Sequence, residues 1–70
     1  MTMQYTKSEK EAWERFDAFM AEQGWSKFHL FMRGNKWVKG DDILLYDRNG
    51  WQLNGQILTE QELFNTLRYA

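Results

Sequence analysis

The segment from Ile43 to Asn54, with the sequence ILLYDRNGWQLN, indicates the fold of this chain more clearly than any other. Two runs rich in apolar and aromatic residues flank the pair Asn49-Gly50. An Asn-Gly pair between such runs is a strong local signal for a β-hairpin, because both residues tolerate the positive φ angles of a tight turn. The segment is therefore predicted to form two antiparallel strands.

The length of the turn decides which side chains share a face of this hairpin, because a shift of one residue exchanges the two faces of a strand. The sequence is compatible with a two-residue loop, which places Tyr46 opposite Leu53, and with a three-residue loop, which places Asp47 opposite Trp51. The shared face is Leu44, Tyr46, Trp51 and Leu53 in the first case and Ile43, Leu45, Trp51 and Leu53 in the second. All residues from 43 to 46 are apolar, so we expect this strand to be central and covered on both sides.

A second hairpin is predicted upstream. Phe28, Leu30 and Met32 alternate with Lys27, His29, Phe31 and Arg33, which is typical of a half-buried strand. Gly34-Asn35 offers a two-residue turn into a strand that ends at Lys39, and Gly40-Asp41-Asp42 forms the next turn. This register places Arg33 opposite Lys36. One face is then mostly apolar, and the other displays Lys27, His29, Phe31, Arg33, Lys36 and Val38.

Helices are predicted at both ends of the chain. The first begins near Thr6 or Ser8, since both positions have the spacing of a capping box, and Gly24 ends it. The second spans about residues 60 to 68, with a capping box at Thr59-Glu60-Gln61-Glu62 and a hydrophobic staple before it. The apolar stripe of the first helix is Ala12, Trp13, Phe16, Phe19 and Met20, and that of the second is Leu63, Phe64 and Leu67.

Together these elements predict one small α+β domain over residues 1–70, with the order αββββα, about four short strands in two hairpins, and helices on one or both faces. A chain of 70 residues buries only about 60% of the surface that its unfolded form exposes. It has no cysteine and one histidine, so neither disulfides nor a zinc site of thiolates and imidazoles can stabilise it. Packing of its four tryptophans, three tyrosines and five phenylalanines must do so.

Charge and hydropathy exclude several classes of partner. Nine basic and ten acidic side chains give a net charge of −1, which excludes strong global attraction to nucleic acid or to acidic membranes. The longest purely apolar run is Ile43 to Tyr46, and the segment from Met1 to Glu11 has no apolar core of a signal peptide. We therefore expect no membrane association, and a cytoplasmic location.

The inventory of reactive side chains predicts a protein that is not an enzyme, with no catalytic residue, cofactor or metal. Ser8 and Ser26 fall at a helix cap and in a connection, and the only imidazole, that of His29, has no carboxylate partner that the sequence suggests. The side chains that could offer oxygen ligands do not have the spacing of an EF-hand and are assigned to turns. These side chains are Asp41, Asp42, Asp47 and Asn49.

The one candidate site is the segment from Ser26 to Gly40, which is basic, contains no acid and carries interleaved aromatic residues. Such a strand surface suits a phosphate backbone with a base stacked on a ring, and it suits an acidic protein equally well. The alternative is that the charges only keep a short edge hairpin from pairing with other sheets. The predicted partner-binding residues are Lys27, His29, Phe31, Arg33, Lys36 and Lys39.

The aromatic stripe of the first helix allows a second candidate. Trp13, Phe16 and Phe19 would either form part of the core or line a ligand pocket with Trp37 or Trp51. Core packing is the commoner role of a stripe at helical spacing.

These observations favour a non-enzymatic interaction protein that binds a larger macromolecule, in the first place a protein, and inhibits or adapts it. Small accessory proteins of phages and mobile elements are often of this type. The alternative is a nucleic-acid-binding protein that uses the basic aromatic hairpin 27–39. The chain is expected to be a monomer or a homodimer.

Overall fold

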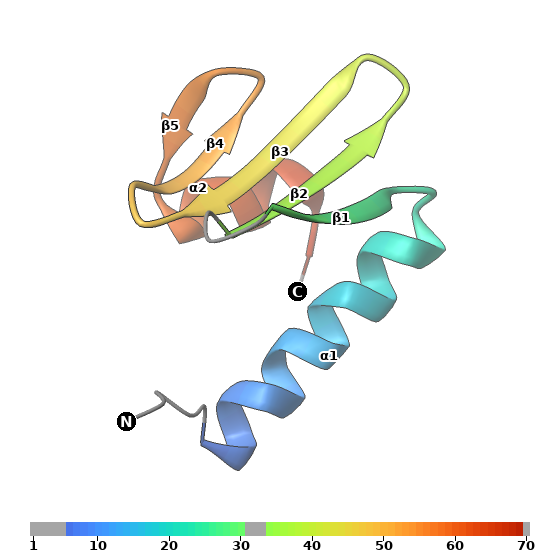
Figure 1. The fold of residues 1–70 in the computed structure, drawn as a ribbon, viewed down its shortest axis with the longest axis vertical. Helices are drawn as coiled ribbons and strands as arrows, with labels where there is room; N and C mark the ends of the chain where they lie inside the picture. Colours follow the sequence, from blue (N-terminus) through green and yellow to red (C-terminus); the bar gives the residue numbers. More distant parts are fainter. Residues whose placement is uncertain (1–5, 31–33, 70) are drawn as a thin grey trace.

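Five antiparallel strands form a single sheet in which each strand pairs with its neighbours along the chain, and a helix lies at each end (Figure 1). This is a computed structural model, and it describes residues 6–30 and 34–69. The predicted α+β class, with an N-terminal and a short C-terminal helix, is confirmed. The elements are α1 (Lys7–Glu22), β1 (Ser26–Leu30), β2 (Gly34–Lys39), β3 (Asp42–Asp47), β4 (Gly50–Leu53), β5 (Gln56–Leu58) and α2 (Glu60–Leu67).

Capping boxes define the start of both helices. At α1 the amide of Glu9 donates to Oγ1 of Thr6 over 3.1 Å, and Thr6 returns a hydrogen bond from its own amide to the Glu9 carboxylate. Of the two predicted starts, the one at Thr6 is therefore the observed one. Thr59 and Glu62 repeat the arrangement at α2, as predicted. Each box satisfies two amide groups that have no partner within the helix.

The C-terminal ends of the helices rely on residues with positive φ. Gly24, at φ +95°, follows α1 and lets the amide of Trp25 donate to the carbonyl oxygen of Met20. Arg68, at φ +59°, plays the same part after α2, where the amide of Tyr69 donates to the carbonyl oxygen of Phe64. The predicted stop at Gly24 is confirmed.

The sheet has five strands where about four were predicted. The additional strand, β5, follows a two-residue turn at Asn54-Gly55, since Leu53 pairs with Gln56. Both turn residues have positive φ, +52° and +84°, as a type I′ turn requires. The Asn-Gly pair on which the prediction of the β3–β4 hairpin was based therefore also occurs at residues 54 and 55, but the strand that follows it has only three residues.

The predicted register of β1 and β2 is wrong. Leu30 pairs with Gly34 and Lys27 pairs with Trp37, so the connection consists of residues 31–33 and the turn does not lie at Gly34-Asn35. The predicted pair of Arg33 with Lys36 lies in part outside the described residues. The consequence is that Lys27 shares a face with Trp37, and Phe28 shares the opposite face with Lys36.

For β3 and β4 the two-residue loop is the observed one. Leu44, Tyr46, Trp51 and Leu53 share a face, although Tyr46 lies opposite Trp51 and not opposite Leu53 as predicted. The side chain of Asp47 accepts a hydrogen bond from the amide of Asn49 over 2.8 Å and so holds the turn.

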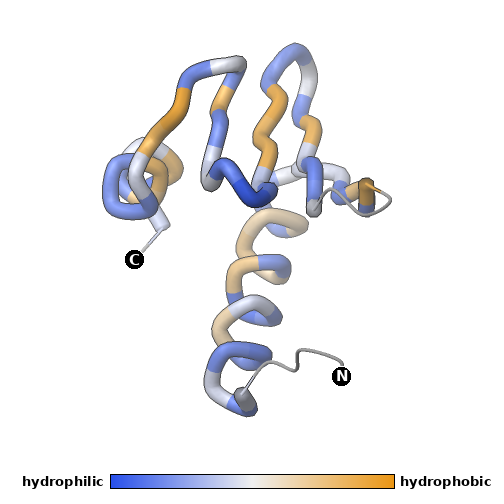
Figure 2. Tube along the Cα trace, turned by 60° about the vertical axis from the view of Figure 1, so that its left-hand side comes forward, coloured by the Kyte–Doolittle hydropathy of each residue, from blue (hydrophilic) through white to orange (hydrophobic). Residues whose placement is uncertain are grey.

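Both helices pack on this face of the sheet, and the core lies between them and the strands (Figures 1 and 2). Leu44 of β3 is completely buried there. On the other face of the same strand, however, Ile43 is 42% exposed. The prediction that this strand is covered on both sides is therefore wrong, although β3 is central. The buried core is Phe16, Met20, Trp37, Leu44, Trp51 and Leu63.

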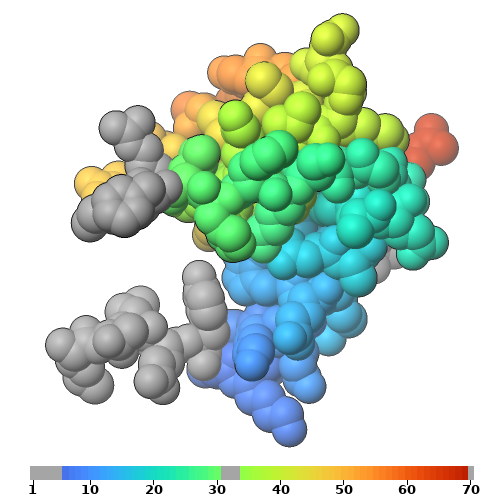
Figure 3. Space-filling view, turned by 45° about the vertical axis from the view of Figure 1, so that its right-hand side comes forward, coloured from blue at the N-terminus to red at the C-terminus, as the bar shows by residue number. Residues whose placement is uncertain are grey.

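Helix α1 reaches beyond the sheet. Its C-terminal half supplies the buried Phe16 and Met20, while every residue from Lys7 to Ala12 is exposed. Seen from the side of β1, the sheet rests on the C-terminal half of α1, and the N-terminal turns project below it (Figure 3). The helix therefore forms one wall of the space under the sheet and extends into solvent.

Candidate binding surfaces

The face of the sheet that carries neither helix, the outer face, is rich in apolar side chains. Strand pairing places Phe28, Lys36, Leu45, Gln52 and Ile57 in one row across all five strands. A second row runs from Ser26 through Val38 to Ile43. Among the described residues, no element covers these rows.

Three of these side chains are largely exposed: Phe28 at 49%, Ile43 at 42% and Ile57 at 69%. Leu45 and Val38, between them, are half-buried. Lys36 is the one charged residue in the long row, and its ammonium lies 5.7 Å from the centroid of the Phe28 ring. A cation over a ring face is attracted by the ring quadrupole. The long row of the outer face thus combines three apolar side chains with Gln52 and one positive charge. Asp47, two residues after Leu45 in β3, lies on the same face at its edge.

Of the predicted partner-binding residues, the four that the structure describes do not all lie on one side of the sheet. Lys27 lies on the helix side, where its Nζ is 2.7 Å from Oδ2 of Asp17 and 5.5 Å from the centroid of the Trp37 ring. Nδ1 of His29, on the same side, is 2.8 Å from Oδ1 of Asn35. Phe31 and Arg33 are outside the described residues.

The two remaining predicted residues face opposite ways. Lys36 lies on the outer face, whereas Lys39 pairs with Asp42 on the side of Trp37. Lys39 is exposed near the end of α1, where its Cε would lie 3.8 Å from a Cβ built on Gly24. The structure therefore brings Lys27 and Lys39 to one side of the sheet and Lys36 to the other.

Sequence reasoning did not find the outer face, because it assigned Phe28 and Leu30 to the core side of their hairpin. The alternation of period two was recognised correctly, but the turn of the hairpin and the side of β1 that faces the helices were wrong. Ile57 was missed with its strand. An Asn-Gly turn at residues 54 and 55 was the available signal for it.

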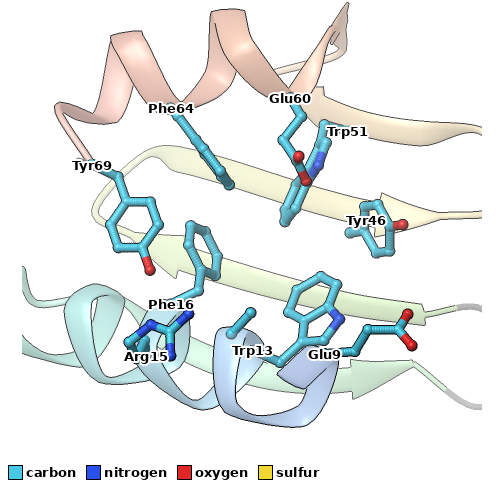
Figure 4. A pocket seen from close by; sticks show the side chains of 10 residues that line it. Glu9, Trp13, Arg15, Phe16, Tyr46, Trp51, Glu60, Phe64 and Tyr69 are labelled. Carbon is cyan, nitrogen blue, oxygen red and sulfur yellow. The ribbon is translucent and has the colours of Figure 1, made fainter. Parts of the chain in front are cut away.

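A cleft of about 520 Å³ opens between α1, α2 and the neighbouring strands (Figure 4). Trp13, Phe16 and Trp51, which were predicted as either core or pocket, line it, and the latter two are also buried in the core. Trp37 is 1% exposed and does not line it. The lining residues are Glu9, Ala12, Trp13, Arg15, Phe16, Tyr46, Trp51, Glu60, Phe64 and Tyr69.

Charge in the described part of the chain is mostly solvated. The capping hydrogen bonds from Thr6 and Thr59 lower the pKa of Glu9 and of Glu62, because they stabilise the ionised carboxylates. Within residues 6–30 and 34–69, no three acidic or histidine side chains gather as metal ligands would. No helix in these ranges is long and apolar enough to cross a membrane.

Comparison with known proteins gives no family for this chain: no family model, curated protein or solved structure matches it.

Proposed function

We propose that this protein is a non-enzymatic binding protein that places the outer face of its sheet on a larger protein and so inhibits or adapts it. The exposed apolar side chains of Phe28, Ile43 and Ile57 on this face support this function best. We further propose that it acts in the cytoplasm, as small accessory proteins of phages and mobile elements do.

In a chain of this size, apolar side chains that stay exposed on the outer face are lost to a core that is already small. A domain of 70 residues has a small core, and Phe28, Ile43 and Ile57 contribute little to it while they stay in water. Contiguous apolar surface on a small protein marks an interaction site more often than chance exposure does. A partner segment with an apolar ridge would bury these side chains, and a carboxylate on that segment would pair with Lys36.

The alternative, nucleic-acid binding through the hairpin 27–39, receives less support. A phosphate-tracking surface needs several free cations on one face. Lys27 is held by Asp17, and Lys36 lies on the opposite side of the sheet from Lys27 and Lys39. This alternative predicts a strongly salt-dependent affinity that an Arg33→Glu, Lys36→Glu variant loses.

A matched pair of substitutions tests the proposal. Ile57→Lys places a charge on the outer face, while Gln56→Lys places the same charge on the adjacent residue, which is exposed on the opposite side. Wild type and both variants are immobilised in parallel, and the proteins that each retains from an extract of the source cells are quantified by mass spectrometry. The proposal is supported if wild type and Gln56→Lys retain a partner that Ile57→Lys loses. The purified partner must then also bind wild type and Gln56→Lys directly, with higher affinity than it binds Ile57→Lys.

Other outcomes contradict it. Equal retention by all three proteins would place the interaction elsewhere. Sedimentation of a dimer that only Ile57→Lys dissociates would show that a second copy covers the outer face. Salt-dependent binding to labelled DNA or RNA that Arg33→Glu, Lys36→Glu abolishes would establish the nucleic-acid alternative.

A further inference from the structure

We infer that the cleft between α1 and α2 is a separate binding site for an arginine side chain presented by a protein. The cleft lies on the helix side of the sheet, opposite the outer face, so the inference goes beyond the proposed function and does not depend on that face.

Aromatic rings form the walls of the cleft. Ring centroids of Trp13 and Trp51 are 5.8 Å apart, and those of Tyr46 and Trp51 are 4.4 Å apart. Phe16 and Trp51 are anchored in the core, at 3% and 5% exposure, so the walls are fixed. Trp13 and Tyr46 are only half-buried and leave ring surface open to a ligand. The remaining rings, those of Phe64 and Tyr69, continue the wall toward α2.

Charged groups lie at the two ends of the cleft. Figure 4 shows Glu9 and Glu60 at the end that contains Trp13, Tyr46 and Trp51, and Arg15 at the other end, beside Phe16 and Tyr69. Within the described residues neither Glu60 nor Arg15 forms an ion pair. Glu9 uses one carboxylate oxygen in the capping box, which also keeps that carboxyl ionised. One end of the cleft is therefore aromatic and acidic.

This combination favours a cation with a flat, weakly hydrated head. Ring faces carry negative potential and attract cations, and a desolvated cation gains more than a solvated one. A guanidinium can stack on an indole ring and donate two hydrogen bonds to one carboxylate, which an ammonium cannot do. Arg15 at the opposite end repels a second cation and so restricts the site to one.

The shape of the cleft indicates where this guanidinium comes from. A volume of about 520 Å³ is within the range of small-molecule sites. Those sites enclose most of their ligand, however, whereas four of the six rings that bound this cleft are only half-buried. The ligand therefore stays partly in water. An arginine side chain of a protein fits this requirement, because the main chain that carries it can run along the open side of the cleft.

The test uses the full chain and a peptide, Gly-Gly-Arg-Gly-Gly with blocked ends, with citrulline in place of arginine as the neutral isostere. Binding is followed by NMR through the indole N–H signals of the tryptophans. We expect saturable shifts of the Trp13 and Trp51 signals with the arginine peptide and at least tenfold weaker binding of the citrulline peptide. N-butylguanidinium should bind at least fivefold more weakly than the arginine peptide.

Two exposed glutamates supply the matched variants, so loss of folding does not confuse the result. Glu60→Gln removes a carboxylate from the cleft and should lower the affinity for the arginine peptide about fivefold. Glu14→Gln makes the same change on the exposed surface of α1 outside the cleft, and its affinity should equal that of wild type.

Three results would overturn the inference. Equal affinity for the arginine and citrulline peptides, or no saturable shift with either, would show that the cleft does not select a cation. Unchanged affinity in Glu60→Gln would place the peptide elsewhere. Binding of N-butylguanidinium as tight as that of the peptide would show that the ligand is a free organic cation and not a protein side chain.

Discussion

Asn54 and Ile43 exchange two hydrogen bonds beyond the last paired residues of β3 and β4. The amide of Asn54 donates to the carbonyl oxygen of Ile43 over 2.8 Å, and the amide of Ile43 donates to Oδ1 of Asn54 over 2.8 Å. The side-chain nitrogen of Asn54 also donates to Asp42, over 3.1 Å. The backbone amide and the side-chain oxygen of Asn54 together thus extend the hydrogen bonding between β3 and β4 by one position, into the turn after β4.

Replacement of Asn54 by alanine should lower the free energy of unfolding by about 1–3 kcal/mol, because the amide of Ile43 loses its acceptor and alanine tolerates a left-handed backbone less well than asparagine. Urea denaturation measures the loss. Asn54→Gly separates the two causes, since glycine adopts φ +52° freely but offers no acceptor. If Asn54→Gly were as stable as wild type, the side-chain hydrogen bonds would contribute nothing.

Gly34 should be the least replaceable glycine of the chain. It has φ +111°, and a Cβ at this position would overlap the carbonyl oxygen of Tyr46 on the paired strand. We expect Gly34→Ala to lower the free energy of unfolding by clearly more than a left-handed alanine alone costs, because relief of the overlap requires the first residues of β2 to move away from Tyr46. Circular dichroism and urea titration measure this effect.

Gly55→Ala is the control for that experiment. Gly55 has φ +84°, but a Cβ there would meet no atom within 4 Å. Its substitution should cost only the strain of a left-handed alanine, about 1–2 kcal/mol. Equal losses in the two variants would show that the close approach of Gly34 to Tyr46 does not matter.

The sequence predicts those parts of the fold that local chemistry determines. The caps at Thr6, Gly24 and Thr59 were predicted, with Ser8 as the alternative start of α1, because a capping box or a left-handed residue depends on neighbours a few positions away. The observed face of β3 and β4 was one of two alternatives, because the sequence did not decide the length of the turn. The register of β1 and β2 did not, because it depends on a three-residue connection and on which side of the strand meets the helices.

The candidate surfaces were predictable only in part. That Trp13 and Trp51 meet is a consequence of one helix packing over one sheet face, and their role as pocket walls was one of two alternatives. The outer face has no local signature, since Leu44 and Leu45 are identical in type and only the placement of both helices on one side distinguishes them. Strand alternation also divides the described part of the basic run, since Lys36 lies on the side of the sheet opposite to Lys27 and Lys39.

Acid should weaken both helix starts. Hydrogen bonds in the capping boxes lower the pKa of Glu9 and Glu62 in the folded state below the ordinary value of 4.5. A carboxyl whose pKa falls on folding contributes stability above its unfolded pKa, and this contribution is lost as the pH drops through the folded value. The urea midpoint should therefore decline from about pH 5 downward, as the capping carboxylates take up protons.

The double variant Glu9→Gln, Glu62→Gln isolates this effect. Glutamine can still fill the third position of a capping box but does not titrate in this range. The variant should lose part of the decline below pH 5 and should be less stable than wild type at pH 7, because a neutral glutamine lacks the contribution that the ionised carboxylate makes there. An unchanged slope of midpoint against pH would assign the acid sensitivity to other carboxylates.

Adjacent leucines in β3 test whether the outer face is free in the isolated protein. Leu44 is completely buried between the strands and both helices, whereas Leu45 is half-buried in the outer row. Leu44→Ala should cost about 2–5 kcal/mol, which is a large part of the stability of a small domain, because it leaves a cavity in the core. Leu45→Ala should cost about 1 kcal/mol, since water already reaches that side chain and fills the space left by its removal. Urea titrations of both variants at two protein concentrations 50-fold apart measure the difference. A loss with Leu45→Ala as large as that with Leu44→Ala, or a midpoint that rises with wild-type concentration, would mean that the outer face is covered in the folded protein and is not a free surface for a partner.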